Sequence, residues 1–153
     1  MRSSRRHKPA RRDRSSMRAF GVGVVVAVLS IVAVGHARAT PTWLATHVVR
    51  LETNRFVPAE TRVSPGDTVR FINGQGGPHN VQFMAESIPA TAQALLNDAM
   101  TRRILPLTSP MFIVPDEAYT LVVPHLTPGR YAFLCSPHGA SMRGSLRVIP
   151  RGE

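Results

Sequence analysis

The sequence predicts an all-β fold, a Greek-key β-sandwich of about eight strands with one short helix inserted. From residue 46 onward, short runs rich in Val, Ile, Phe and Tyr alternate with Pro- and Gly-containing turns, the pattern of a sandwich. A single Ala- and Leu-rich stretch with helical spacing interrupts these runs. The 114 residues from Thr40 onward are enough chain for one domain.

The N-terminal end has the organisation of a secretory signal peptide. Residues 1–18 carry eight Lys or Arg and one Asp, and an apolar run of 16 residues follows over 19–34. The sequence A-R-A at 37–39 is a small-residue cleavage site, which predicts cleavage between Ala39 and Thr40. We therefore expect an exported protein, in the bacterial periplasm.

The domain boundaries that follow are a signal peptide over 1–39 and a single domain over 40–153. An uncleaved signal would instead tether the protein to a membrane, and Met17 is a second candidate start. The apolar run is shorter than the roughly 20 residues that a spanning helix needs.

Most of the net charge of +10 belongs to the signal. Its removal leaves ten Lys or Arg against eight Asp or Glu, a net charge of +2. A strongly basic domain would indicate nucleic acid or an anionic membrane as a partner, and this domain is not strongly basic. Nucleic-acid binding is therefore not expected.

Turn signals separate the expected strands. Pro65 and Gly66 stand at the centre of "SPGD", as a type II turn prefers. Helical spacing of Ala and Leu predicts one helix of about ten residues within 89–103. The expected strands span 46–53, 55–58, 60–63, 67–73, 79–83, 109–114, 119–123, 130–135 and 144–149.

The chain has one cysteine, and its neighbourhood "YAFLCSPHGASMRG" places Cys135, His138 and Met142 between the last two expected strands. A single cysteine cannot form an internal disulfide, and an exported free thiol must be buried or bound to survive. On a loop, the spacing C-x2-H-x3-M lets all three side chains converge. Thiolate and thioether are soft ligands that select copper, and imidazole suits copper or zinc.

An electron-transfer copper site of this kind needs a second histidine, since its usual set is His2Cys with a weak axial Met. His79 is the strongest candidate, because it stands in "GGPHNVQF" where a Gly-rich loop meets a strand. His47 and His125 are expected to be strand-end or surface residues. The structural alternative makes His79 a strand-end histidine bonded to backbone, Cys135 a small buried hydrophobe and Met142 a filler of the core.

The motifs "PHNVQF", "YAFLCSPHGASMRGSLRV" and "FVPAETRVSPGDTVRFING" resemble the plastocyanin-type blue copper proteins, the cupredoxins, over residues 48–149. The resemblance implies a cupredoxin-like Greek-key sandwich with one copper ion, Cu(II) or Cu(I), at one end. It implies that His79, Cys135 and His138 are equatorial ligands and Met142 the axial one. Plastocyanins usually place four residues between the last His and Met, and here there are three, which leaves the Met142 distance open.

The resemblance also implies residues around the ligands and a role. Asn80 is expected to bond Ser136, and Pro137 removes a backbone donor near the sulfur. Redox protein partners are expected to dock near His138. The function implied is electron transport by an exported carrier that passes single electrons, with no enzymatic reaction.

The alternative function is a periplasmic copper-binding protein for storage or delivery of the metal. Extra Met or His tracts would indicate it, and Met84, Met100 and Met111 are scattered rather than clustered. Zinc is disfavoured by the soft axial donor. A multicopper enzyme would need more histidine clusters and more domains than 114 residues supply.

Overall fold

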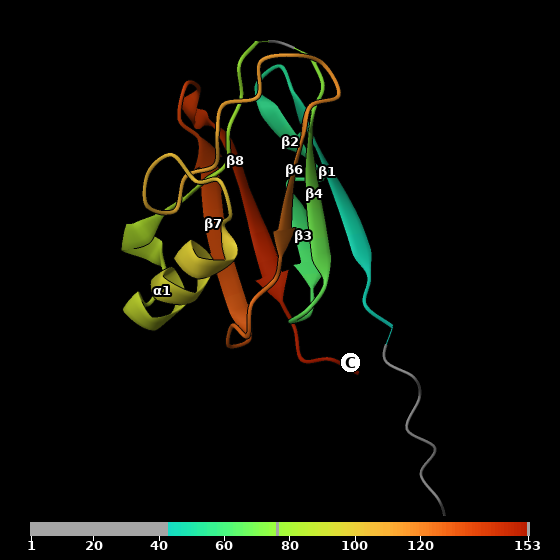
Figure 1. Ribbon diagram of the computed structural model, residues 1–153, viewed down its shortest axis with the longest axis vertical. Helices are drawn as coiled ribbons and strands as arrows, with labels where there is room; N and C mark the ends of the chain where they lie inside the picture. The colour runs from blue at the N-terminus through green and yellow to red at the C-terminus, as the bar shows by residue number, and fades with distance from the viewer. Residues whose placement is uncertain (1–42, 76, 153) are drawn as a thin grey trace, which may run out of the picture. The chain divides into compact units, whose positions relative to one another are not determined.

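The computed structural model describes residues 43–75 and 77–152, which form two four-stranded sheets packed face to face (Figure 1). The signal peptide expected over 1–39 lies outside the described residues, and so does its cleavage site. The prediction of an all-β sandwich with one short helix is confirmed. The strands are β1 (Thr46–Glu52), β2 (Arg55–Val57), β3 (Glu60–Val63), β4 (Thr68–Asn73), β5 (Gln82–Phe83), β6 (Ala118–Val122), β7 (Gly129–Cys135) and β8 (Gly139–Val148).

The first sheet has the strand order β2-β1-β4-β6. β1 runs parallel to β4, with Val49 opposite Phe71, and β6 runs antiparallel to β4, with Tyr119 opposite Phe71. Alternate residues of these strands are fully buried and the others face solvent, which is the period of two expected for a sheet with one packed face.

The second sheet has the order β3-β8-β7-β5, with β3 parallel to β8 and the other pairs antiparallel. Its inner face is centred on Phe133 of β7. The rings of Phe56, Phe71 and Phe83 all meet the Phe133 ring edge-on, at centroid distances of 4.8, 5.5 and 5.6 Å. This cluster joins the two sheets, since the four rings come from strands of both.

Helix α1 (Ala90–Ala99) and the short 3-10 helix η1 (Ala85–Ser87) lie on the side of the sandwich that holds β5 and β7 (Figure 1). α1 buries Ala92 and Leu96 against the core, and Met100, the residue after the helix, is fully buried. Within the described ranges no helix is long and apolar enough to cross a membrane.

The strand expected at 109–114 is absent, and the expectation was wrong. Only Phe112 pairs there, in an isolated bridge with His79. The backbone N–H of Ile113 instead donates to the Glu117 carboxylate at 2.8 Å, so the chain turns where an extended run was expected. The strand expected at 79–83 shrinks to β5 for a related reason, since residues 79–81 bond to this same loop.

Candidate metal centre

His79 lies just before β5 and its side chain is fully buried. Its backbone is fixed by two bonds to Phe112, His79 N–H to Phe112 O at 3.0 Å and Phe112 N–H to His79 O at 2.7 Å. Ring atom Nδ1 lies 2.8 Å from Asn73 Oδ1, and Nε2 lies 3.3 Å from the carbonyl of Thr53. Burial lowers the pKa of His79, the Thr53 carbonyl acts in the opposite direction, and the nearby His138 lowers it further.

Both nitrogens of His79 therefore face oxygen acceptors. Asn73 cannot offer its amino group to the ring, because its Nδ2 donates to Val114 O at 2.9 Å and leaves Oδ1 toward His79. A neutral imidazole has a single N–H and can satisfy only one acceptor at a time. One buried nitrogen lone pair thus has no proton donor, which is the state that a metal-ligating histidine needs.

Cys135 is the last residue of β7 and is fully buried. Its Sγ lies 3.3 Å from Nδ1 of the half-buried His138. A tight turn holds this pair, with His138 N–H donating to Cys135 O at 3.1 Å and the Ser141 hydroxyl donating to His138 O at 2.6 Å. Burial raises the pKa of the Cys135 thiol, while hydrogen bonds from the backbone N–H groups of Asn80 and His138 act to lower it.

His79 and His138 lie side by side, with ring centroids 5.0 Å apart and ring planes tilted by 37°. The structure thus brings three of the four predicted ligands, His79, Cys135 and His138, to one end of the sandwich. We call this end the metal end. In Figure 1 it is the upper end, where the loop after β4 and the turn between β7 and β8 lie.

Met142 is fully buried, as an apolar ligand should be, but it does not lie on a loop as expected. β8 begins at Gly139, so Met142 is a strand residue. Leu134 pairs with Arg143, and an irregularity follows in which Cys135 pairs with Gly139. The irregularity places Met142 beside the end of β7 on the inner face.

No three His, Cys, Asp or Glu side chains within 43–75 and 77–152 are gathered as a finished metal site. Two of the predicted ligands, Cys135 and His138, are in contact, while the His79 ring is turned to Asn73 and Thr53. The donor set of one thiol, two imidazoles and a buried thioether nonetheless fits copper rather than calcium or magnesium.

The other two histidines of the described chain are a strand-end and a surface residue, as expected, and they lie at the opposite end of the sandwich. His47 Nε2 lies 2.9 Å from Asp67 Oδ2, at the start of β4, whereas Asn73 at the metal end closes that strand. His125 is exposed and follows β6, whose Val122 pairs with Thr68 at the same far end.

The hydrogen bond expected between Asn80 and Ser136 is present, and it is double. Ser136 N–H donates to Asn80 Oδ1 at 2.7 Å, and Asn80 Nδ2 donates to Ser136 Oγ at 3.0 Å. Pro137, next in the turn, is exposed. Sequence reasoning missed two contacts, Asn73 to His79 and Gln82 to Ser136. Asn73 falls in phase with the inward-facing residues of β4, and this alternation is the signal that could have indicated its contact with His79.

The chain matches the model of one protein family, described as "Copper binding proteins, plastocyanin/azurin family", over residues 46–149. It is 35% identical over 136 residues to chloroplastic plastocyanin of Pisum sativum, covering 88% of this chain and 74% of that protein. It is also 35% identical to chloroplastic plastocyanin of Chlamydomonas reinhardtii, over 82% of this chain and 77% of that protein.

Solved structures of plastocyanin and amicyanin superpose on this chain, in agreement with the family match. A mutant plastocyanin of fern, solved oxidised and reduced, superposes with a TM-score of 0.52 at 28% identity, over 67% of this chain and 99% of that chain. An oxidised amicyanin variant superposes with a TM-score of 0.50 at 29% identity, over 78% of this chain and 88% of that chain. The resemblance inferred from the sequence is confirmed, as is the expectation that the protein is not an enzyme. The chain is a cupredoxin that belongs to the plastocyanin/azurin family of copper-binding proteins.

Proposed function

We propose that the protein is an exported one-electron carrier whose single copper ion is held by His79, Cys135, His138 and Met142. The observation that supports this most is the contact of Cys135 Sγ with His138 Nδ1, with the His79 ring beside it. Copper bound there would supply a centre that takes up and returns one electron. Solved relatives include oxidised and reduced forms, which supports cycling between two states.

The residues of the chain have separate tasks in this proposal. Cys135 gives up its thiol proton when it binds metal, since thiolate is the ligand form. The bonds from Phe112 fix the backbone of His79, and the turn from Cys135 to Ser141 fixes that of His138. Burial of Cys135, His79 and Met142 keeps water from the sulfur and limits solvent rearrangement when charge changes.

His138 is the predicted ligand that reaches the surface, so electrons would enter and leave through its ring. Exposed apolar side chains stand close to it in the chain, Pro137 of the turn and Ala140 at the start of β8. Ile113 and Val114, which are 72% and 58% exposed, belong to the loop that bonds His79 and Asn73 and add apolar surface at the metal end. We propose that redox protein partners dock on this apolar surface.

The test is direct. Mature protein, residues 40–153, is mixed with Cu(II) and its visible spectrum is recorded. An intense thiolate-to-copper band is expected, and Cys135→Ser should abolish it. His79→Ala should lose copper, while the matched variants His47→Ala and His125→Ala should keep it, because those rings lie at the other end. Copper retained without a thiolate band would contradict the proposal.

Storage or delivery of copper remains the alternative function. Met100 is fully buried beside helix α1, so core packing accounts for its side chain, and Met84 is the one methionine on the lining of a surface cavity rather than part of a Met tract. Voltammetry separates the two functions. A carrier shows a reversible one-electron wave, and a storage protein binds Cu(I) but exchanges electrons slowly and irreversibly.

A further inference from the structure

Gln82 stands outside the proposed ligand set but touches the segment that carries it. It is the first residue of β5 and pairs with Leu134, the residue before Cys135. Its Oε1 accepts the hydroxyl proton of Ser136, the residue after Cys135, at 2.7 Å. Gln82 thus meets the chain on both sides of the cysteine, once through its backbone and once through its side chain.

The bond to Gln82 completes a chain of matched donors and acceptors. Ser136 has one hydroxyl proton, and since this goes to Gln82, the oxygen is left as an acceptor for Asn80 Nδ2 at 3.0 Å. The same Asn80 side chain accepts Ser136 N–H at 2.7 Å. The backbone N–H of Asn80 acts to lower the pKa of the Cys135 thiol, as a donor turned toward the sulfur does. Removal of the Gln82 acceptor would free the hydroxyl to rotate, and Asn80 would lose a fixed partner.

We infer that Gln82 is a positioning residue of the copper site, which holds the Ser136 hydroxyl and so fixes Asn80 and the backbone that follows Cys135. This inference rests on the proposed function. Hydrogen bonds donated to a metal-bound thiolate draw electron density from the sulfur, favour the reduced metal and raise the reduction potential. Gln82 therefore raises the potential of this protein without touching the metal.

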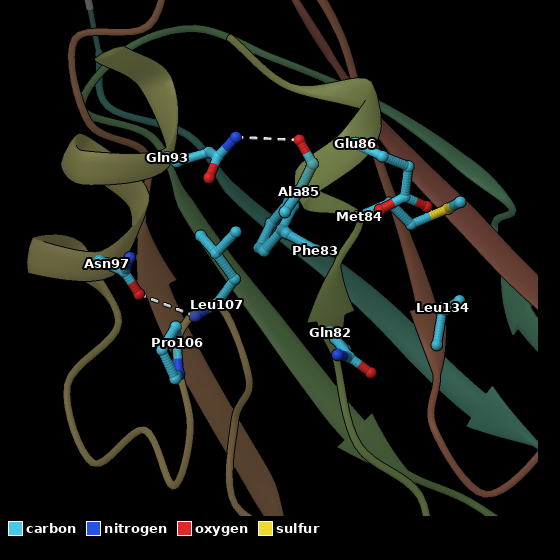
Figure 2. A pocket seen from close by; sticks show the side chains of 10 residues that line it. All are labelled: Gln82, Phe83, Met84, Ala85, Glu86, Gln93, Asn97, Pro106, Leu107 and Leu134. Atoms are coloured by element: carbon cyan, nitrogen blue, oxygen red, sulfur yellow. Dashed lines mark hydrogen bonds between the residues drawn. The ribbon is translucent and has the colours of Figure 1, made fainter. Parts of the chain in front are cut away.

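The surroundings of Gln82 make it a convenient residue to change. It lines a surface cavity of about 280 Å³. Figure 2 shows the residues that line this cavity, among them residues of η1, of α1 and of the loop that carries Leu107. Gln93 lies on another wall of this cavity, and its Nε2 donates to the carbonyls of Ala85 and Ile88, both at 2.9 Å. Gln93 is thus a matched control, with the same side chain and the same cavity but no bond to Ser136.

The experiment compares Gln82→Met and Gln93→Met in the mature copper-loaded protein. For Gln82→Met we expect the ratio of reduced to oxidised copper protein, at a fixed solution potential, to fall about threefold. This corresponds to a reduction potential lower by about 30 mV, at 59 mV per tenfold change. In the copper-free protein, the amide of Ser136 should exchange its hydrogen several-fold faster. Gln93→Met should change neither quantity. In a Ser136→Ala background, Gln82→Met should shift the potential no further, because the bond is already gone.

Unchanged potential and unchanged Ser136 exchange in Gln82→Met would overturn the inference. An equal shift in Gln93→Met would overturn it as well, since the cavity and not the bond would then be responsible. Gln82→Glu keeps an acceptor, so slow Ser136 exchange in that variant supports the inference and fast exchange counts against it. If the wild-type protein does not bind copper, the proposed function is wrong. The exchange measurement needs no metal, so it would still test the Gln82–Ser136 contact in that case.

Discussion

Asn80 and Ser136, 56 positions apart in the chain, exchange two hydrogen bonds of 2.7 and 3.0 Å at the metal end. Asn80 is 1% exposed. The pair joins the segment that enters β5 to the turn that follows β7, and so connects the side of the site that carries His79 to the side that carries Cys135.

Asn80→Ala should lower the free energy of unfolding of the copper-free protein by about 1–3 kcal/mol. The change removes both bonds of the buried Asn80 side chain, and each intramolecular hydrogen bond contributes about 0.5–1.5 kcal/mol. Urea denaturation measures it. Asn54→Ala, an exposed residue of the turn between β1 and β2, should change the free energy by less than about 0.5 kcal/mol. Equal losses in both variants would show that the pair does not stabilise the fold.

Asn73→Ala should weaken copper binding about tenfold. Asn73 Oδ1 holds Nδ1 of His79, and loss of a residue that orients a metal-bound histidine typically costs 10- to 100-fold in affinity, of which we expect about the lower end. Competition with a chelator of known affinity gives the number. Asn97→Ala is the matched control, because Asn97 Oδ1 accepts Leu107 N–H at 2.7 Å beside helix α1, away from the metal end. That variant should lose stability but keep its affinity, and an undiminished affinity in Asn73→Ala would refute the assigned role.

Asp67 should make the stability depend on pH. Its carboxylate is almost fully buried and accepts bonds from the N–H groups of Ala45 and Ser64, from His47 at 2.9 Å and from Arg151 at 3.2 Å. Burial acts to raise the pKa of Asp67, but the bonds from Ser64, His47 and Ala45 outweigh it and hold the pKa below 3.8.

A carboxyl whose pKa is lower in the folded state contributes stability above its unfolded pKa, and this is lost as pH falls toward the folded pKa. The free energy of unfolding should therefore decrease as the pH is lowered below about 4. In Asp67→Asn this part of the pH dependence should vanish, while Asp98→Asn, an exposed residue of α1, should keep it. Urea denaturation from pH 3 to pH 6 makes the comparison, and parallel curves for wild type and Asp67→Asn would disprove the assignment.

Gly144→Ala should destabilise the protein by about 1–3 kcal/mol, the usual cost of overpacking a core. A β-carbon at Gly144 would lie 2.4 Å from Cε2 of Phe133, whose ring cannot retreat because three phenylalanine rings surround it. Thermal unfolding measures the loss. Gly129→Ala, in the neighbouring strand, would meet no atom closer than 3.8 Å and should change stability little. A Gly144→Ala protein as stable as wild type would mean that the sheets separate more easily than this packing implies.

Much of the fold was predictable because its signals are local. Alternation at Val69 and Phe71 marks a strand with one buried face, and Pro65-Gly66 marks the turn before it, where Gly66 adopts a φ of +88°. Where local preference and tertiary contact disagreed, the contact prevailed. The apolar run at 109–114 favours a strand, but the Glu117 carboxylate accepts a hydrogen bond from Ile113 N–H, and the chain turns there.

The sequence by itself determined the kind of chemistry, since the spacing of Cys135, His138 and Met142 brings the donors into one short turn and strand whatever surrounds them. The sequence also indicated His79, but only the tertiary structure decided what lies beside its ring and holds it. His79 meets His138 because two sheets place their ends together, and Asn73 and Gln82 act through contacts between strands that are distant in sequence. Such contacts depend on sheet register, and the residue pattern of one strand does not indicate which strand lies beside it or in what register.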